Sequence, residues 1–463
     1  MAATYLDKCE LLGKGIVLLP NKLNPFEVDN VLQSARRIVV LDEDKKNVGG
    51  TSGKGYQVRK GIDYTEDHHT AAHPLMMETG ANLSDILDAS PSTCSNYTGV
   101  STDGLGKFSY KTALSMSKYY ALVTADYRSF TLELNLDGKE LKLVNDLAHE
   151  ARDLGDWKED ENGVPSTEVY DKYKEFFEKW GTCVIRSCSF GARYQLRVES
   201  HMADILNKEE FATHVEAEYD GIASVSGSVD SKSSSEFKHY QGVRKQKAKV
   251  IGGDSVKNDT LGRSPNDPAK FEAWNKSLND NNAHEAIHVG VVSVGDIVAE
   301  GTDLSEEDRK KAGENLNASL AYFNSFRIVQ GVIKVPGNTF KITNFEFGAS
   351  GPPGIDIRLY PQGSVTSTEV DSTHSKFQCT TKTFTMENNS TAIRSDHMVT
   401  LVNVRIIAPP LPVQLKFSAP LLIPVTLDLE GGPTIKAVMN GMTTREAEYT
   451  VDSLFKQGRY GDE

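Results

Sequence analysis

Three histidines in one short stretch are the first residues whose type and spacing could form a chemical site. His68, His69 and His73 form an HHxxxH pattern beside Glu66 and Asp67. Imidazole and carboxylate groups are common zinc ligands, so the pattern is compatible with a metal site. The same residues are typical of a polar loop. We favour that interpretation and expect no bound metal.

Two other stretches come close to known chemical motifs without completing them. VGGTSGKG at 48–55 is one residue short of the phosphate-binding pattern GxxxxGK[ST], and Gly55 replaces its Ser or Thr. His149 and Glu150 lack the second histidine of the HExxH zinc motif. No nucleophile and base form a local catalytic signature. We therefore expect no enzyme and no cofactor.

The five cysteines do not indicate a disulfide framework, because their number is odd and their spacing wide. Cys183 and Cys188 are close in sequence, but in a continuous strand their side chains point to opposite faces, which forbids a bridge. We expect buried free thiols.

Composition and charge exclude several classes of protein. The chain has 463 residues, 38% hydrophobic and 25% charged, which allows two or three domains. No stretch approaches the roughly 18 apolar residues of a membrane-spanning helix. The start of the chain has only a short apolar run beside Glu10 and two lysines, so we expect no signal peptide.

The net charge of −13 falls entirely on residues 1–325, because residues 326–463 contain 13 basic and 13 acidic side chains. Such acidity argues against nucleic-acid binding, which needs basic groups opposite phosphates. It also argues against simple attraction to anionic lipid. We expect no nucleic-acid partner, and any membrane partner to be held by a specific receptor or headgroup contact.

Periodicity divides the chain into a mixed part and a β-rich part. Helical spacing or an N-cap signal marks residues 142–155, 168–180 and 305–322. Strand signals dominate the end of the chain, as in VQLKF at 413–417 and VTLDL at 425–429. These patterns predict a first domain over 1–335 and a C-terminal β-rich domain over 336–463.

Two segments in the mixed part alternate with a period of two residues. The first is 106–136, whose apolar positions include Phe108, Tyr110, Leu114, Met116, Tyr120 and Leu122. The second is 214–235, with polar residues between Val215, Ala217, Tyr219, Ala223, Val225 and Val229.

Such alternation fits a half-buried sheet, which is the simpler interpretation, or a strand that crosses a membrane with one polar side. The apolar side of 214–235 is mostly Ala, Gly and Val, and would form a poor core. This stretch could be helical at first and extended later.

Glycines inside an apparent strand weaken a sheet unless a bend or a close approach needs them. Trp180, Gly181 and Thr182 are followed, after eight intervening residues, by Gly191 and Ala192. With its flanks, this stretch resembles the motif of the membrane-attack-complex/perforin (MACPF) family: an aromatic, Gly-Thr-His, an aromatic, six residues and Gly-Gly. It departs from the motif at Cys183, Val184 and Ala192.

Further matches have the same order and spacing as in the family. A helix with paired phenylalanines precedes the motif, an Arg-Tyr strand follows it, and a hydrophobic-Gly-Gly element ends at Gly252 and Gly253. An aromatic-x-x-Trp element at 271–274 follows. The resemblance covers about residues 90–300.

The resemblance implies an α+β fold: a bent, twisted four-stranded antiparallel sheet flanked by two helical clusters, joined here to a C-terminal all-β domain. In pore-forming members the clusters unfold into membrane-spanning β-hairpins. By position, they correspond to residues 98–136 and 203–252, which contain the alternating segments. Gly252 and Gly253 would be the hinge of the second hairpin.

A lone hairpin in lipid would expose unpaired backbone groups, so insertion requires a closed barrel made by many subunits. The first arm of the second segment is acidic and the return arm, with Lys245 and Lys247, is basic. Opposite charges on neighbouring strands pair favourably, although a solvated charged face is the simpler interpretation.

The resemblance thus predicts a pore-forming toxin that binds a target cell membrane through a lipid or protein receptor, assembles into a homo-oligomeric ring and inserts two hairpins per subunit. Whether a second membrane-binding component takes part stays open. We expect a released or ingested protein used in defence or offence. The alternative is a non-lytic family member that acts in adhesion or signalling.

Overall fold

The computed structural model describes residues 4–19, 32–49, 55–101, 114–115, 117–135, 141–219, 234–278, 284–336, 344–361, 365–371, 374–379, 398–418, 424–429, 434–438 and 445–450. The chain forms two compact units. The first consists of residues 1–110, 117–157 and 171–324, and the second of 111–116, 158–170 and 325–463.

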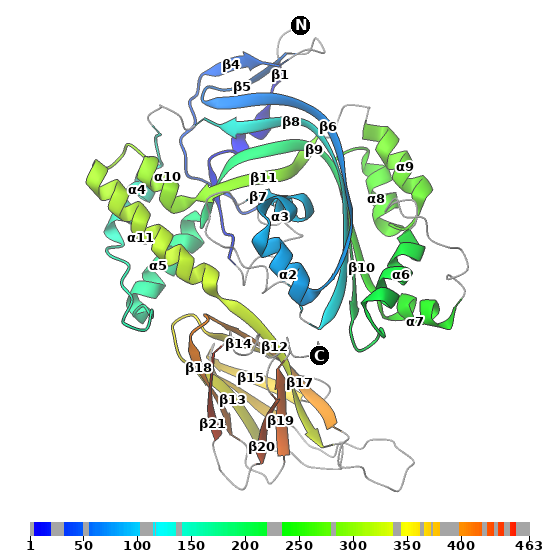
Figure 1. Cartoon of the computed structure of the whole chain (residues 1–463). Helices are drawn as coiled ribbons and strands as arrows, with labels where there is room; N and C mark the ends of the chain where they lie inside the picture. The colour runs from blue at the N-terminus through cyan, green and yellow to red at the C-terminus, as the bar shows by residue number, and fades with distance from the viewer. Residues whose placement is uncertain are drawn as a thin grey trace. The chain divides into compact units, whose positions relative to one another are not determined.

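A bent antiparallel sheet is the centre of the first unit (Figure 1). Its strands are β6 (Ile62–Thr79), β8 (Lys118–Leu134), β9 (Cys183–His201) and β10 (Lys245–Ile251). Each strand pairs antiparallel with the next in the order β6, β8, β9, β10. The expected four-stranded antiparallel sheet is therefore confirmed.

Strand β9 changes one of its neighbours half-way along its length. Up to Gly191, β9 pairs with β11 (Glu285–Ser293), and from Arg193 to Glu199 it pairs with β10. Its other edge pairs with β8 along nearly the whole strand. Figure 1 shows β6, β8 and β9 curving between the half that contains β11 and the half that contains β10.

Two helical excursions leave the β10 half of the sheet. The first excursion joins β6 to β8 and contains α2 (Gly80–Ala89) and α3 (Pro91–Thr98). The second excursion joins β9 to β10 and contains α6 (Lys208–Tyr219) and α7 (Ser235–Val243). In Figure 1 the two excursions lie on opposite sides of the sheet.

Side-chain caps start these helices. The Thr79 hydroxyl accepts a hydrogen bond from the Asn82 N–H at the start of α2. Ser90 does the same for α3, where Pro91 occupies the first turn, and Ser234 does so for α7. Such caps satisfy N–H groups that have no partner inside the helix.

The predicted bounds of the helical clusters need correction. Residues Lys118–Leu134, assigned to the first cluster of 98–136, form strand β8 of the central sheet, and helices α2 and α3 precede the predicted start. The alternation of period two comes from a strand that is already paired. The second prediction, 203–252, contains α6 and α7, but its end is strand β10.

The polar-loop interpretation of His68, His69 and His73 is also wrong, because all three lie on β6. Among the described strands β6 pairs only with β8, so it is an edge strand of this sheet. Exposed polar and charged side chains are common on edge strands, where they discourage pairing with other chains.

The remaining helices of the first unit are α4 (Asn145–Asp153), α5 (Thr167–Trp180), α8 (Ser255–Arg263), α9 (Pro268–Ser277), α10 (Val294–Glu300) and α11 (Glu306–Ser325). Helices α4, α5 and α11 confirm the helices predicted at 142–155, 168–180 and 305–322. Among the described helices, none is long and apolar enough to cross a bilayer.

Short elements complete the first unit. They are β1 (Thr4–Tyr5), the 3₁₀ helix η1 (Asp7–Leu11), β2 (Lys14–Ile16), β3 (Arg36–Arg37), β4 (Lys45–Val48), β5 (Tyr56–Arg59) and β7 (Val100–Ser101). Strand β2 pairs with β9, and β7 pairs with β11, so both extend the β11 half of the sheet.

The second unit contains two five-stranded sheets, ordered β14–β17–β12–β19–β20 and β15–β16–β13–β18–β21. Their bounds are β12 (Arg327–Pro336), β13 (Asn344–Ser350), β14 (Asp356–Pro361), β15 (Val365–Asp371), β16 (His374–Cys379), β17 (Met398–Ala408), β18 (Pro412–Ser418), β19 (Pro424–Leu429), β20 (Thr434–Val438) and β21 (Arg445–Thr450). Strands β18 and β19 confirm the two predicted strands. Strand β12 belongs to this unit, although the sequence prediction left it before the boundary at 335.

Candidate functional site

The Trp-Gly-Thr motif fixes the start of β9 against the N-terminal part of the chain. Trp180 is the last residue of α5, and Gly181 has a φ of +100° that favours glycine. A Cβ on Gly181 would lie 2.6 Å from the backbone nitrogen of Ile16. The buried Thr182 hydroxyl accepts a hydrogen bond from the Leu18 N–H at 2.8 Å. These residues position β9 rather than perform chemistry.

Gly191 lies where β9 exchanges β11 for β10. A Cβ at this position would lie 1.8 Å from the carbonyl oxygen of Tyr127 on β8, closer than any real contact. The register between β8 and β9 shifts at the same place, between Arg128 and Phe130. This close approach explains why a glycine interrupts the strand, while Ala192 beside it is buried.

Gly252 and Gly253 directly follow β10, at the end of the sheet's last strand. Their φ angles are +70° and +83°, in the left-handed region that favours glycine. A Cβ on Gly253 would lie 3.1 Å from Nε1 of Trp274, and this indole nitrogen donates to the Gly252 carbonyl at 3.4 Å. The pair forms a tight turn against α9. The hinge role of the pair stays a prediction.

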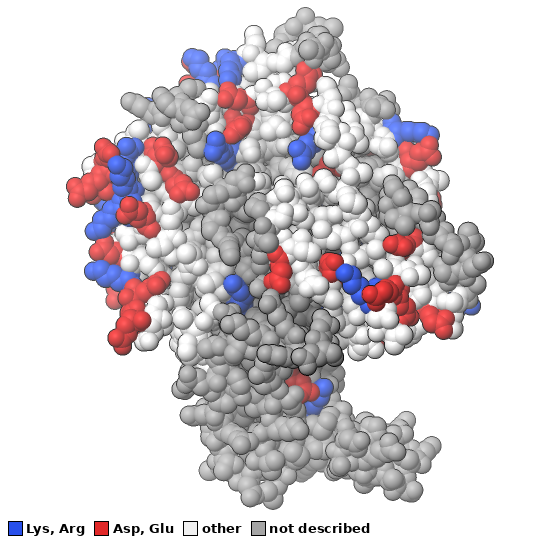
Figure 2. All heavy atoms as spheres, in the orientation of Figure 1, with Lys and Arg blue, Asp and Glu red and all other residues white. Residues whose placement is uncertain are grey.

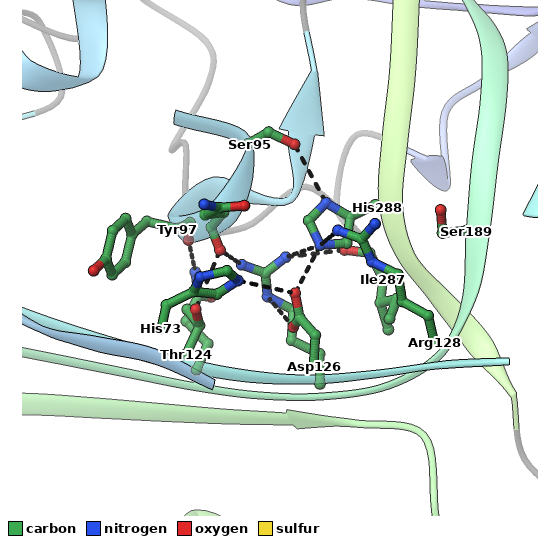
Figure 3. A network of polar contacts seen from close by, with 12 residues as sticks. His73, Ser95, Tyr97, Thr124, Asp126, Arg128, Ser189, Ile287 and His288 are labelled. Atoms are coloured by element: carbon green, nitrogen blue, oxygen red, sulfur yellow. Dashed lines mark hydrogen bonds and ion pairs between the residues drawn. The ribbon is translucent and has the colours of Figure 1, made fainter. Parts of the chain in front are cut away.

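A buried polar network lies between α3 and the sheet (Figure 3). Its charged and titratable members are His73 on β6, Asp126 and Arg128 on β8, Arg193 on β9 and His288 on β11, and we call these five residues the α3 network. Asp126, Arg193 and His288 are buried, at 1%, 2% and 6% exposure. Asp126 is the single anion among the five.

Asp126 is at the centre of the network. Its Oδ2 accepts a hydrogen bond from His288 Nε2 at 2.7 Å, and its Oδ1 lies 3.4 Å from Arg193 Nε. Arg128 Nη2 also lies 3.2 Å from His288 Nε2, and His73 Nε2 lies 3.9 Å from Asp126 Oδ2. The carboxylate therefore faces one guanidinium group and two imidazoles, and a second guanidinium group, that of Arg128, lies against His288.

The network holds α3 through the carbonyl groups at the end of the helix. Arg193 Nη2 donates to the carbonyl of Asn96, which also accepts from the Thr124 hydroxyl at 3.2 Å. Gln195 Nε2 donates to the Tyr97 carbonyl at 2.5 Å. The last carbonyls of a helix lack partners inside the helix and carry its negative dipole end. A buried guanidinium is thus well placed to bind this end.

Burial sets the protonation of the network. It lowers the pKa of His288 and of His73, against the raising effect of Asp126, so both imidazoles are neutral at pH 7. Burial alone would raise the pKa of Asp126, but Arg193 and the hydrogen bond from His288 outweigh it and lower this pKa. The network therefore contains one negative and two positive charges at pH 7.

The second excursion attaches to the opposite face of the sheet through a mainly apolar cluster. The fully buried residues Phe211, Val215 and Tyr219 of α6 pack with Tyr240 of α7 and with odd-numbered β8 residues such as Tyr119. The rings of Tyr119 and Phe211 stack with centroids 5.6 Å apart. This contact is hydrophobic, in contrast to the polar attachment of α3.

One ion pair accompanies this apolar cluster. The Arg244 guanidinium, directly after α7, contacts the Glu218 carboxylate of α6 through two nitrogen atoms. The two side chains are 14% and 2% exposed. The hydrogen bonds with Glu218 raise the pKa of Arg244. An acidic residue from one arm of the second excursion thus binds a basic residue from the other.

The structure separates the residues predicted for the first hairpin. Tyr120 and Leu122 are buried on β8, on the same face as Asp126. Leu114 is buried in the segment before β8. Phe108, Tyr110 and Met116 lie outside the described residues.

For the second hairpin, Val215, Ala217 and Tyr219 are buried on α6 in the apolar cluster. Ala223, Val225 and Val229 lie outside the described residues. The period-two pattern of 214–235 therefore begins within a helix, as the sequence interpretation allowed.

Sequence reasoning missed the α3 network. His73, Asp126, Arg193 and His288 come from four strands that are far apart along the chain, and no local spacing connects them. The available signal was an acidic residue, Asp126, directly after the mainly apolar and aromatic run at 119–125 of β8. The prediction of buried free thiols is confirmed for Cys9, Cys94, Cys183 and Cys188.

Comparisons with known proteins agree with this arrangement. The family model described as the MAC/Perforin domain matches residues 11–330. No curated protein matches the sequence. Among solved structures, GNIP1Aa from Chromobacterium piscinae is 10% identical, with a TM-score of 0.44, and the match covers 94% of this chain and 79% of that one.

Two further solved structures are more distant. Astrotactin-2, a vertebrate-specific perforin-like membrane protein, is 8% identical with a TM-score of 0.29, over 87% of this chain and 69% of that one. Suilysin from Streptococcus suis is 9% identical with a TM-score of 0.23, over 95% and 88%. The family model covers more than half of the sequence, including the whole bent sheet and both excursions. The chain belongs to the MAC/Perforin domain family.

Proposed function

We propose that this protein forms pores: it binds a target membrane, assembles into a ring and converts its two helical excursions into membrane-spanning β-hairpins. Proteins of this family are non-enzymatic pore formers. Relatives bind membranes and oligomerise into rings. The proposal concerns which segments of this chain insert and how.

The strand register is the observation that carries the proposal. β6 and β8 pair up to Thr79 and Tyr119, where the first excursion begins and ends. β9 and β10 pair up to Glu199 and Lys245 around the second excursion. Each excursion therefore joins two strands that are already antiparallel neighbours. Extending β6 with β8, or β9 with β10, in the existing register therefore produces a hairpin, and no strand has to change its direction.

The excursions are long enough for this conversion. Residues 80–118 lie between the last paired residues of β6 and β8, and residues 200–244 lie between those of β9 and β10. Half of either excursion is longer than the roughly 9–11 residues of a tilted membrane-spanning strand. In this scheme Val215, Ala217 and Tyr219 move into the second hairpin. Tyr120 and Leu122 remain in the sheet.

Ring assembly follows from the two edges of the sheet. Within the described part of the chain, β6 pairs only with β8 and β10 only with β9. In lipid, unpaired backbone groups on extended edges would each cost several kcal/mol, so neighbouring subunits must close them. We therefore propose that assembly precedes insertion.

We also propose that the β-sheet unit from about residue 325 recognises the target. On the face shown in Figure 2, described Lys and Arg side chains lie among Asp and Glu rather than in a patch of one sign. Residues 326–463 contain 13 basic and 13 acidic side chains and have no net positive charge, which supports a specific lipid headgroup or protein receptor over general attraction to anionic lipid.

A reversible cross-link tests the conversion of the second excursion. Lys208 on α6 and Glu78 on β6 form an ion pair of 2.7 Å, and both side chains are partly exposed. In the double variant Glu78→Cys/Lys208→Cys, a bifunctional maleimide with a reducible spacer joins α6 to the sheet. We expect dye release from liposomes or target cells to stop on cross-linking and to return on reduction.

The matched control is Lys46→Cys/Asp63→Cys, which replaces an ion pair of 3.1 Å between β4 and β6, away from both excursions. Cross-linking of this variant with the same reagent is expected to leave dye release intact. Equal leakage from the cross-linked and reduced Glu78/Lys208 variant would overturn the conversion of α6. A chain that binds cells but releases no dye and forms no rings on any membrane favours the adhesion or signalling alternative.

A further inference from the structure

The attachment of α3 depends on a group of side chains with more positive than negative charge. With both imidazoles neutral, the α3 network has one carboxylate, Asp126, against the guanidinium groups of Arg128 and Arg193. Nε2 of His288 lies 3.2 Å from Arg128 Nη2 and 3.4 Å from Arg193 Nη1. A proton on His288 would add a third positive charge to this buried group.

Nothing on the helix itself offsets such a charge. The sequence of α3, PSTCSNYT, contains no charged side chain. Its C-terminal carbonyls, which could otherwise stabilise a cation, already accept hydrogen bonds from Arg193 and Gln195. The facing elements contribute His73 from β6, Asp126 and Arg128 from β8, and Arg193 from β9, and β7 contributes no charge.

His288 contacts α3 directly through its second nitrogen. Its Nδ1 lies 3.4 Å from the Ser95 hydroxyl of α3. Because Nε2 donates to Asp126, neutral Nδ1 is an acceptor and the hydroxyl donates to it. A protonated Nδ1 becomes a donor, so this contact requires the hydroxyl to turn away and accept instead. Protonation thus alters a contact of the helix as well as the charge beneath it.

The network also leaves buried polar atoms without hydrogen-bond partners among the described residues. They are Nε2 of His73, Oδ1 of Asp126, and Nε of Arg128 and of Arg193. Unsatisfied buried groups carry a desolvation cost that water would remove once the helix left. The attachment of α3 is therefore ordered but incompletely satisfied.

We infer that the α3 network is an acid-sensitive latch, in which protonation of His288 and His73 releases α3 from the sheet. Its use in pore formation rests on the proposed function, because α3 belongs to the first excursion. A latch of this kind would favour conversion of the first excursion at an acidified membrane surface. Among its described residues, the second excursion is held mainly by apolar contacts and has no equivalent buried cluster of cations.

The sign of the effect follows from linkage. Burial lowers the pKa of both histidines in the attached state, whereas in the released state they return towards about 6.5. The released state therefore binds more protons below about pH 6.5. Attachment is fully stable above that pH and weakens as the pH falls, with up to about a tenfold gain in the released population per histidine per pH unit.

Amide hydrogen exchange on the full chain without membrane tests the latch separately from pore formation. Exchange rates of residues 91–98, corrected for the intrinsic rate at each pH, give the fraction of time that α3 is open. Between pH 6.5 and 5.5 we expect this fraction to rise about fivefold from one histidine and up to about 30-fold from both. Amides of α11 report global unfolding, and we expect the open fraction of α3 to exceed the globally unfolded fraction at every pH.

Substitutions assign the effect to its residues. His288→Gln retains an amide donor near Asp126 but does not titrate. In this variant we expect only the part of the pH dependence of α3 opening that is due to His73. The double variant His288→Gln/His73→Gln is expected to lose the pH dependence. The control His149→Gln changes an exposed histidine of α4 and is expected to behave as wild type.

Three results would overturn the latch. The first is a wild-type α3 whose corrected exchange does not change between pH 7.5 and 5.5, and this needs no variant to fold. The second is an open fraction of α3 that equals the unfolded fraction reported by α11 at each pH, which would mean that α3 opens only by global unfolding. The third is a full pH dependence that persists in the double variant. None of these results depends on whether the protein forms pores.

Discussion

The two helical excursions pack on opposite faces of one sheet by different physical means. The first is held at α3 by charged groups that bind backbone carbonyls, and the second at α6 and α7 by stacked aromatic and aliphatic side chains. Alternate residues of the same strands serve both faces, since Asp126 and Arg193 face α3 while Val123 and Tyr194 face the second excursion. One sheet thus supports attachments with different sensitivity to pH.

This difference predicts separate ways of weakening each attachment. Polar contacts depend on charge balance, so changes of protonation or of one charged residue should act on α3. Apolar contacts depend on buried volume, so truncations should act on α6. The three tryptophans, Trp157, Trp180 and Trp274, all lie in the first unit, so their fluorescence follows unfolding of that unit.

The largest effect is expected from Asp126→Asn. It removes the single anion of the α3 network and leaves the buried guanidinium group of Arg193 without its counter-charge beside the half-buried Arg128, at a cost of about 3–5 kcal/mol in unfolding free energy. Denaturant unfolding followed by tryptophan fluorescence measures this loss, and exchange at residues 91–98 should rise. Asp259→Asn, on the exposed surface of α8, is the matched control. A similar loss in both variants would contradict the role of the network.

Val215→Ala should weaken the second attachment without affecting the first. Val215 is fully buried on α6, and its truncation removes apolar contact and leaves a cavity, at about 2–3 kcal/mol. Hydrogen exchange at pH 7.5 should rise in α6 and α7 but not in α3. The exposed neighbour Thr213→Ala serves as the control. Faster exchange in α3 would show that the two attachments are coupled.

Lowering the pH should destabilise the first unit through its buried histidines. Burial lowers the pKa of His73, His284 and His288, so the unfolded chain takes up more protons below about pH 6.5. Stability is retained above that pH and lost as the pH falls, by up to about 1.4 kcal/mol per histidine per pH unit. Unfolding curves at pH 7.5, 6.5 and 5.5 measure the slope. A flat profile in this range would be inconsistent with neutral buried imidazoles.

The smallest effect is expected from Lys208→Ala. This variant removes the ion pair with Glu78, whose partners are partly exposed, and such pairs contribute about 0–1 kcal/mol. Added salt should reduce the difference from wild type further. A loss greater than about 2 kcal/mol would mean that α6 depends on charge much as α3 does.

The sequence predicted the fold more accurately than it predicted the bounds of the two helical excursions. The motif around Trp180 and Gly191 indicated the family, and the predicted helices near α4, α5 and α11 are present. The first cluster was misplaced because alternation of period two marks any half-buried strand, whether it lies in the sheet or forms later in a membrane. Strand β8 already belongs to the sheet, so its pattern could not distinguish these two cases.

The α3 network was beyond sequence reasoning for a different reason. His73, Asp126, Arg193 and His288 meet only because four strands align in one register. Their individual positions look ordinary: a histidine in a polar stretch, an arginine beside the motif and a histidine on a later strand. Burial and mutual distance make them a network, and neither property is local in sequence. The aromatic packing of α6 was likewise hidden within a pattern that fits a strand.

The change of neighbour along β9 has a mechanical consequence. Hydrogen bonds between β9 and β11 end at Gly191, and those between β9 and β10 begin at Arg193, so the two ladders share a strand without sharing a rung. New rungs can be added beyond Glu199 and Lys245 while every bond to β11 stays in place. The sheet can then lengthen at the β10 end while the β11 end keeps its hydrogen bonds and its position.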